Sequence, residues 1–297
     1  MTADSPPVDS GRGRRLATWL HRRPRVQLAG LLAAPLAWIG LAYLGSLAIL
    51  LLNAFWVQDS FSGKVVPTFT LASFERLFTV EIYRTIAVRT IVMALAVTIT
   101  DVLLAFPIAY YMARVASPRT RRLLVIAVLI PLWASYLVKI YAWRVILQGN
   151  GVLDWLLAPL GLTGPGLREV NNSWIVLSYL WLPYMIVPIY AGLERLPGSL
   201  LEASADLGAR AGTTFRRVVL PLVFPAIVAG SIFTFSLTLG DYITPTMVSG
   251  TKFIGNVIYD NSSLGSLPLA AAFSFVPIVI VIAYLLVARR LGAFESL

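Results

Sequence analysis

The sequence contains no cysteine and only one histidine, His21, which lies in an arginine-rich N-terminal stretch. Without cysteine there can be no disulfide, no thiolate nucleophile and no cysteine-ligated metal site. A single histidine in a tail leaves no imidazole for a metal cluster or a catalytic triad. We therefore expect no catalytic residue, no metal site and no cofactor bound by this chain.

Charged residues are also scarce. They make up 13% of the 297 residues, whereas 58% are hydrophobic, and the mean hydropathy is +0.79. A soluble domain carries about 25% charged residues and fewer than about 50% apolar ones. This deficit of charge predicts a chain that lies in a lipid bilayer.

Long uncharged runs predict where the chain crosses the bilayer, because a spanning helix needs about 20 mainly apolar residues. One run is interrupted only by Asp101, and another reaches spanning length only if it continues through Lys139. The sequence therefore predicts an all-α polytopic membrane protein with six transmembrane helices, near residues 29–52, 88–112, 123–147, 174–193, 220–240 and 268–288.

The charges that remain are mostly positive, with a formal net charge of +10. An even number of spans puts both termini on one side of the membrane. Of the 24 basic residues, 16 fall in the N-terminal tail, the loops at 113–122 and 193–219, and the C-terminus. Basic residues in short loops mark the cytoplasmic side, so both termini are predicted to be cytoplasmic. The basic excess thus reflects topology, and no nucleic-acid partner is expected.

The N-terminal tail resembles a secretory signal in one respect, since arginine pairs at 14–15 and 22–23 precede an apolar run. The apolar region of a signal peptide spans about 7–15 residues, and the run at 26–58 is far longer. We therefore expect an uncleaved first helix held by a basic tail.

The predicted loop at 194–221 is longer and more patterned than a simple connector. The Pro-Gly pair at 197–198 ends the preceding helix, and Ser199 can cap a new one, with Glu202 at the capping-box position. Apolar residues then recur at spacings of three or four and predict one stripe, at Leu200, Ala203, Leu207, Ala211 and Phe215.

An amphipathic helix of this kind could lie in the lipid headgroups or dock in a groove of a soluble partner. Small residues at 203–205 allow close backbone approach, which favours the protein groove. Pro221 suits the first turn of the next span, where its missing N–H costs nothing.

The residue order in this loop resembles the EAA loop of bacterial ABC importer permeases. The matching positions are Glu202, Ala203, Ser204, Gly208, Ala209, Phe215, Leu220 and Pro221. The family pattern most often has alanine where this chain has Ser204. The resemblance implies that the segment is a coupling helix that inserts into a cleft of an ATPase subunit. We expect the matching positions, together with Asp206, to form the contact with that subunit.

The likeness extends over residues 70–290, roughly. Segments at 131–143, 183–188 and 254–258 look like those of spermidine/putrescine permeases, especially the first of the two paired subunits. This resemblance implies the type I permease fold of ABC importers in the bacterial inner membrane. The implied divisions are a cytoplasmic basic tail (1–26), a first transmembrane helix with a periplasmic segment (27–85), the permease core (86–291) and a C-terminal tail (292–297).

The resemblance also implies partners: two ATP-binding subunits, a second permease subunit that forms a heterodimer with this chain, and a periplasmic or lipid-anchored solute-binding protein. The chain has no Gly-x-x-x-x-Gly-Lys-Ser/Thr phosphate loop, so it is not expected to be an enzyme, and ATP and magnesium would sit on the partner. Glu202 is expected to hold the coupling helix by capping, or by pairing with Arg210, Arg216 or Arg217. Gly208 is expected to permit the turn that follows.

The candidates for a translocation path are Asp101, Trp133, Tyr141, Asp241 and Tyr242. A charge in the middle of a span, such as Asp101, costs about 2.5–3.5 kcal/mol on insertion scales. This carboxylate could balance a cationic substrate, or it could pair with a basic side chain or a neighbouring helix. Asp241 and Tyr242 could form a substrate gate or a loop cap.

Aromatic residues near the outer helix ends, Tyr136 and Trp181 among them, are mostly expected in the interfacial belt. A minority could line the path and attract an ammonium group. The resemblance favours a polyamine as the solute, with an opine, another small organic solute or a metal chelate as alternatives. An ion-coupled secondary transporter would explain Asp101 but not the patterned loop.

Overall fold

The computed structural model describes residues 24–59, 62–162, 164, 166 and 170–290. Most of the expected basic tail (1–26) and all of the expected C-terminal tail (292–297) lie outside these residues. The chain separates into two compact units, one formed by Met1–Asn53 and one by Ala54–Leu297. Each unit is described here by itself.

The described part of the first unit is a helical run, which begins as α2 (Pro24–Ala37), passes through a π-helical stretch η1 (Trp38–Leu44) and ends as α3 (Gly45–Leu52). The apolar window of the span at Gly30–Phe55 is 0% buried within the chain. A helix of this length that is apolar on all sides is suited to lipid. The predicted first span, at 29–52, is confirmed.

The second unit contains four further candidate spans, Glu81–Val115, Val170–Arg195, Ala211–Gly240 and Leu267–Arg290. They correspond to α5 (Glu81–Tyr110) with its π-helical extension η3 (Tyr111–Val115), α9 (Val170–Arg195), α12 (Leu220–Gly240) with the short helices before it, and α15 (Leu267–Arg290). Four predicted spans are thereby confirmed, because each has the length and apolarity that a bilayer requires.

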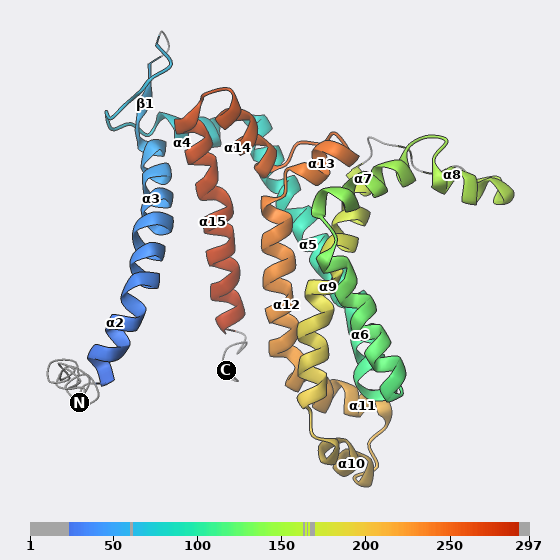
Figure 1. The fold of residues 1–297 in the computed structure, drawn as a ribbon. Helices are drawn as coiled ribbons and strands as arrows, with labels where there is room; N and C mark the ends of the chain where they lie inside the picture. The colour runs from blue at the N-terminus through green and yellow to red at the C-terminus, as the bar shows by residue number, and fades with distance from the viewer. Residues whose placement is uncertain (1–23, 60–61, 163, 165, 167–169, 291–297) are drawn as a thin grey trace, which may run out of the picture. The chain divides into compact units, whose positions relative to one another are not determined.

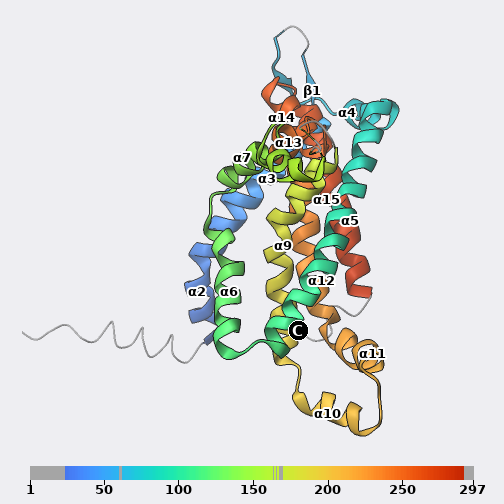
Figure 2. The ribbon, with the colours of Figure 1, turned by 90° about the vertical axis from the view of Figure 1, so that its right-hand side faces the viewer.

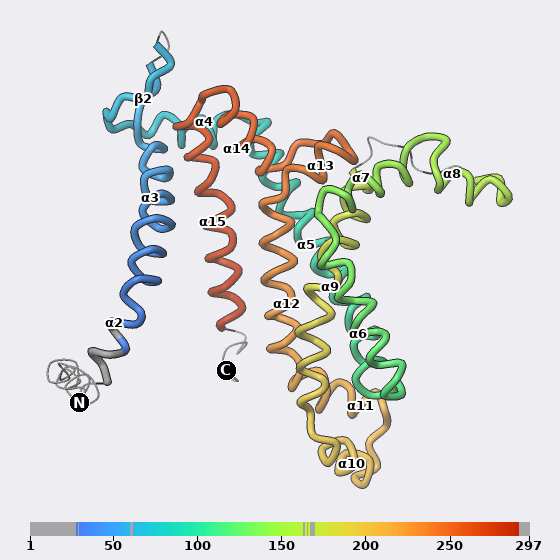
Figure 3. Tube along the Cα trace, in the orientation of Figure 1, coloured from blue at the N-terminus to red at the C-terminus, as the bar shows by residue number. Residues whose placement is uncertain are grey.

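The span predicted near 123–147 is not one continuous helix, although the two helices at this place together make a sixth candidate span of the described residues. The structure has two helices, α6 (Pro118–Trp133) and α7 (Tyr136–Leu147), bent by 96° at the break between them, and Figure 3 follows this turn along the chain. Ala134 and Ser135 both adopt extended backbone conformations, with ψ of 139° and 133°. Hydrophobicity cannot reveal such a break, because both halves are apolar.

Helices α5, α9 and α12 pack against one another and form the centre of the second unit (Figures 1 and 2). Small residues bring α9 and α12 close together. A Cβ atom added at Gly192 would lie 2.7 Å from the Cβ of Ala226, and one added at Gly230 would lie 2.8 Å from the Sδ of Met185. These glycines therefore allow a helix separation that any larger side chain would prevent.

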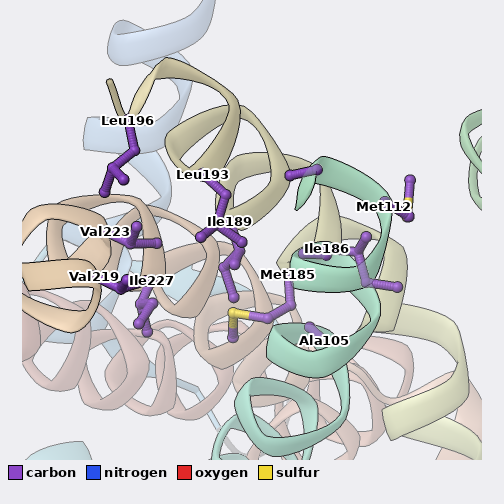
Figure 4. Packing of buried hydrophobic residues seen from close by; sticks show 12 residues of the cluster. Ala105, Met112, Met185, Ile186, Ile189, Leu193, Leu196, Val219, Val223 and Ile227 are labelled. Atoms are coloured by element: carbon purple, nitrogen blue, oxygen red, sulfur yellow. The ribbon is translucent and has the colours of Figure 1, made fainter. Parts of the chain in front are cut away.

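Figure 4 shows the apolar cluster that fills this three-helix packing. Ala105 comes from α5, Met185 and Ile189 from α9, and Val223 from α12, and all four are buried. The cluster continues to Leu196, just beyond the end of α9. The core therefore reaches the start of the loop for which a coupling role is predicted.

Short elements cover the opposite end of the unit, at the top of Figure 1. They are η2 (Asn53–Phe55), β1 (Val57–Gln58) paired antiparallel with β2 (Val65–Val66), α4 (Ala72–Thr79), α8 (Val152–Leu157), η4 (Ala158–Leu160), α13 (Ile243–Val248) and α14 (Ile254–Ser263).

Candidate functional site

The segment between α9 and α12 contains α10 (Gly198–Asp206), α11 (Ala211–Thr214) and a π-helical stretch η5 (Phe215–Val219). Figures 1 and 2 both place α10 beyond the ends of α9 and α12, at the end of the unit opposite α13 and α14. A helix exposed in this way is available to a partner.

The start of α10 differs from the prediction. Its N-cap residue is Pro197, no side chain caps the helix, and the amide of Leu200 donates to the carbonyl of Pro197 at 3.2 Å. Ser199 therefore lies inside the first turn, and the predicted capping box with Glu202 is not formed. Glu202 is exposed, and none of the hydrogen bonds or ion pairs of the described residues involves it, so it does not pair with an arginine there.

The end of α10 agrees with the prediction for Gly208. This residue has φ of +71°, a conformation that glycine adopts at little cost. The amide of Gly208 donates to the carbonyl of Ala205 at 2.8 Å, and the amide of Ala209 donates to the carbonyl of Ser204 at 3.0 Å. This pair of bonds is a Schellman motif, which satisfies the last carbonyls of the helix.

Ser204 links the two helices of the loop. It is buried, and its Oγ lies 2.8 Å from the Oγ1 of Thr214 at the end of α11. The serine that departs from the common alanine of the EAA pattern thus has a structural partner. Ala203 and Asp206, by contrast, are exposed on α10.

The predicted single stripe from Leu200 to Phe215 is divided, because the helix stops at Gly208. Leu207 is 88% exposed, whereas Phe215 packs edge-on against Phe106 of α5, with ring centroids 5.3 Å apart. Leu200 and Leu207 are therefore exposed in the first half of the loop, whereas Phe215, itself 37% exposed, attaches the second half to the core.

Pro221 lies in the first turn of α12, as predicted. However, the helical run continues without interruption from Ala211 through Leu220 to Gly240. The π-helical stretch η5 directly precedes α12, and such stretches accommodate a locally lost hydrogen bond.

At the other end of α12, Asp241 accepts four hydrogen bonds. Its Oδ1 accepts from the amides of Ile243 at 2.9 Å and Thr244 at 3.1 Å. Its Oδ2 accepts from the hydroxyl of Thr244 at 2.8 Å and from the hydroxyl of Tyr136. Asp241 therefore caps α13, and through Tyr136 it also ties α13 to the bent third span.

A cavity of about 320 Å³ lies beside this carboxylate. It is lined by Tyr136, Trp181, Ser236, Leu237, Gly240, Asp241, Tyr242 and Ile243. The rings of Tyr136 and Trp181 stack with centroids 6.0 Å apart, and the indole N–H of Trp181 is buried without an acceptor among the described residues. Carboxylate, aromatic faces and a free N–H donor therefore meet at one site.

The structure brings together two of the predicted path residues, Asp241 and Tyr242, at this cavity. Trp133 and Tyr141 do not line it and are 91% and 50% exposed. Tyr136 and Trp181 belong to the aromatic group in which most residues were expected in the interfacial belt and a minority along the path, and the sequence did not single out these two. No local signal could have paired Tyr136 with Asp241, because they are 105 positions apart.

Asp101 is completely buried on α5. Ser178 of α9 is the polar side chain that interacts with its carboxyl group, but neither carboxyl oxygen forms a hydrogen bond of normal geometry with the described residues. Pairing with a basic side chain, one of the alternatives for Asp101, is absent from the ion pairs of that part of the chain. A partnerless carboxyl group in the protein interior is costly.

Residues 105–294 match the profile of a family described as binding-protein-dependent transport system inner membrane component. The chain is 48% identical to the inner membrane ABC transporter permease protein YdcU of Escherichia coli K12, over 100% of this chain and 99% of that protein. It is 33% identical to the spermidine/putrescine transport system permease protein PotB of Haemophilus influenzae, over 71% and 74% of the two chains. The PotC protein of the E. coli K12 spermidine/putrescine system is 34% identical over 36% of this chain and 43% of that protein.

The fold is similar to that of a chain in the crystal structure of a bacterial ABC transporter involved in the import of the acidic polysaccharide alginate. The TM-score is 0.68 at 21% identity, over 93% of this chain and 99% of the other. A second structure of the alginate transporter, in complex with an alginate pentasaccharide-bound periplasmic protein, has a TM-score of 0.66, also at 21% identity, over 93% and 98% of the two chains.

Proposed function

The chain belongs to the family of inner-membrane components of binding-protein-dependent transport systems, as the permease subunit of an ABC importer, and we propose that its solute is a polyamine such as spermidine or putrescine. The cavity beside Asp241 is the observation that carries this proposal. An ammonium group is attracted by a carboxylate and by the faces of aromatic rings. The cavity offers both, with Tyr136, Trp181 and Tyr242 around the acid.

The hydrogen bonds of Asp241 fit a gate. In the described structure the hydroxyl of Tyr136 occupies Oδ2, so the carboxylate is covered from the side of the third span. Movement of α7 away from α13 would remove this donor and leave an acceptor for a substrate ammonium group. The relatives named for spermidine and putrescine transport support the same class of solute.

The exposed apolar face of α10 supports a role in coupling. We infer that this helix docks in a cleft of an ATP-binding subunit, two copies of which supply the energy. The set for this contact remains Glu202, Ala203, Ser204, Asp206, Gly208, Ala209, Phe215, Leu220 and Pro221. In this arrangement Leu207 and Leu200 would be buried by the partner, while Phe215 transmits force to α5.

The remaining partners would be a second permease subunit and a solute-binding protein. A second permease subunit is supported by the relatives, which include both PotB and PotC permeases of spermidine/putrescine transport systems. A solute-binding protein is supported by the periplasmic protein in the second alginate transporter structure. In this proposal α10 and both termini lie on the cytoplasmic side, since the short basic loops lie there.

The test is uptake by the complete transporter, reconstituted from all of its subunits in proteoliposomes. We expect uptake of radiolabelled putrescine or spermidine that requires ATP inside the vesicles and the binding protein outside. Asp241→Asn should lower this uptake strongly. Asp260→Asn is the matched control, because Asp260 forms only an exposed ion pair with Lys252 at 2.6 Å.

Two outcomes would contradict the proposal in different ways. ATP-driven uptake of another solute, with no thermal stabilisation of the binding protein by putrescine or spermidine, would reject the polyamine. Uptake driven by a proton gradient in the absence of ATP would reject the ATP-driven mechanism.

A further inference from the structure

Two arginines connect the helix ends next to α10. Arg114 lies in η3, the extension of α5, and its Nη2 donates to the carbonyl of Leu193 at 2.7 Å and also to the carbonyl of Leu196. Leu193 is in the last turn of α9, and Leu196 directly follows the helix. Carbonyls at a helix C-terminus lack intrahelical donors, and a guanidinium group supplies both hydrogen bonds and favourable charge there.

Arg121 plays the same role for the preceding helix. It lies in the first turns of α6, and its Nε and Nη2 donate to the carbonyls of Met112 and Ala113, each at 3.0 Å. Its Nη1 lies 3.8 Å from the Oε1 of Glu194, which accepts from the hydroxyl of Tyr190 at 2.8 Å. The ion pair is half-exposed and contributes little by itself, so the bonds to the carbonyls dominate.

Together these contacts join three helix ends into one body. Arg121 fixes the start of α6 to the end of the α5 run, and Arg114 fixes the end of that run to α9. Only Pro197 separates Leu196 from the first residue of α10, and the side chain of Leu196 is itself buried in the core cluster. Leu196, two positions before α10, is therefore held both by Arg114 and by the core.

We propose that Arg114 and Arg121 form a joint that transmits movement of α10 to all three helices at once. They are positioning residues, which touch neither solute nor nucleotide. The inference rests on the proposed docking of α10 to an ATP-binding subunit. Beyond that docking, the proposal makes the amount of solute transported per ATP hydrolysed depend on two guanidinium groups that lie outside the docking surface.

The experiment compares solute transported per ATP hydrolysed in proteoliposomes that contain the complete transporter. Arg114→Met keeps an unbranched side chain of similar reach to the aliphatic part of arginine and removes the guanidinium donors, and Arg121→Met does the same at the second arginine of the joint. We expect each variant to assemble and to hydrolyse ATP, but to lower the transport ratio by about tenfold, within the usual range of coupling free energies. Arg114→Lys, with three donors on its ammonium group, should restore most of the ratio.

Arg122→Met is the matched control, because Arg122 is exposed on α6 and forms no hydrogen bond or ion pair within the described residues. A wild-type ratio in both joint variants would overturn the inference while leaving the proposed function intact. If Arg114→Met is not recovered in the membrane, a wild-type ratio in Arg121→Met alone overturns it. A wild-type complex that neither hydrolyses ATP nor takes up solute would instead reject the proposed function.

Discussion

Replacing Asp101 by asparagine should make the chain more stable. The carboxyl group is completely buried and neither oxygen has a hydrogen-bond donor of normal geometry among the described residues. An unsatisfied buried polar group costs about 1–3 kcal/mol. Asparagine has nearly the same shape and no charge, and its amide group can donate to the hydroxyl of Ser178, the side chain that interacts with this position.

We therefore expect Asp101→Asn to stabilise the folded chain by about 1–3 kcal/mol. The assay is the thermal midpoint of the purified protein in detergent, where a gain of this size should appear as a rise of several degrees. Thr98→Val is the control, because the buried hydroxyl of Thr98 already donates to the carbonyl of Ala94 at 2.7 Å.

A fall in the midpoint of Asp101→Asn, as large as the one that Thr98→Val causes by losing its hydrogen bond, would refute this reasoning. It would mean that the carboxylate has a partner that asparagine cannot satisfy. A higher midpoint combined with reduced uptake would instead identify Asp101 as a residue retained for transport at the expense of stability.

Three other substitutions test the loop and the helix packing. The Gly208→Asp chain should insert into the membrane normally, but the transporter should lose transport and uncouple ATP hydrolysis, because the φ of +71° at Gly208 disfavours a side chain. Gly212→Ala is the control and should transport normally, because Gly212 has open space around it and no positive φ. Gly192→Ala should lower the free energy of unfolding in detergent by about 1–3 kcal/mol, because the new Cβ would lie 2.7 Å from the Cβ of Ala226. Gly240→Ala is its control, because a Cβ there would meet nothing within 4 Å. Ser204→Ala should lower the thermal midpoint slightly, corresponding to about 0.5–1.5 kcal/mol for one lost hydrogen bond, without reducing uptake; a large loss of uptake would contradict a merely structural hydroxyl.

Features that depend on one stretch of chain were predictable from the sequence. Apolar length located five spans, because the bilayer imposes the same requirement on each helix separately. The turn at Gly208 was predictable as well, since a left-handed residue at a helix end is a local property of glycine. The start of α10 was not predictable, because the folded loop places Pro197 at the N-cap and Ser199 inside the first turn, where it cannot form the capping box.

Hydropathy and charge place this chain in a membrane and locate roughly where it crosses and where the patterned loop lies. The folded protein adds the bend between α6 and α7, the hydrogen bond of Tyr136 to Asp241 and the contact of Arg114 with a carbonyl 79 positions away. Each of these depends on how separate helices pack. Hydropathy records how each segment interacts with lipid, but it carries no information about which faces of two helices will touch.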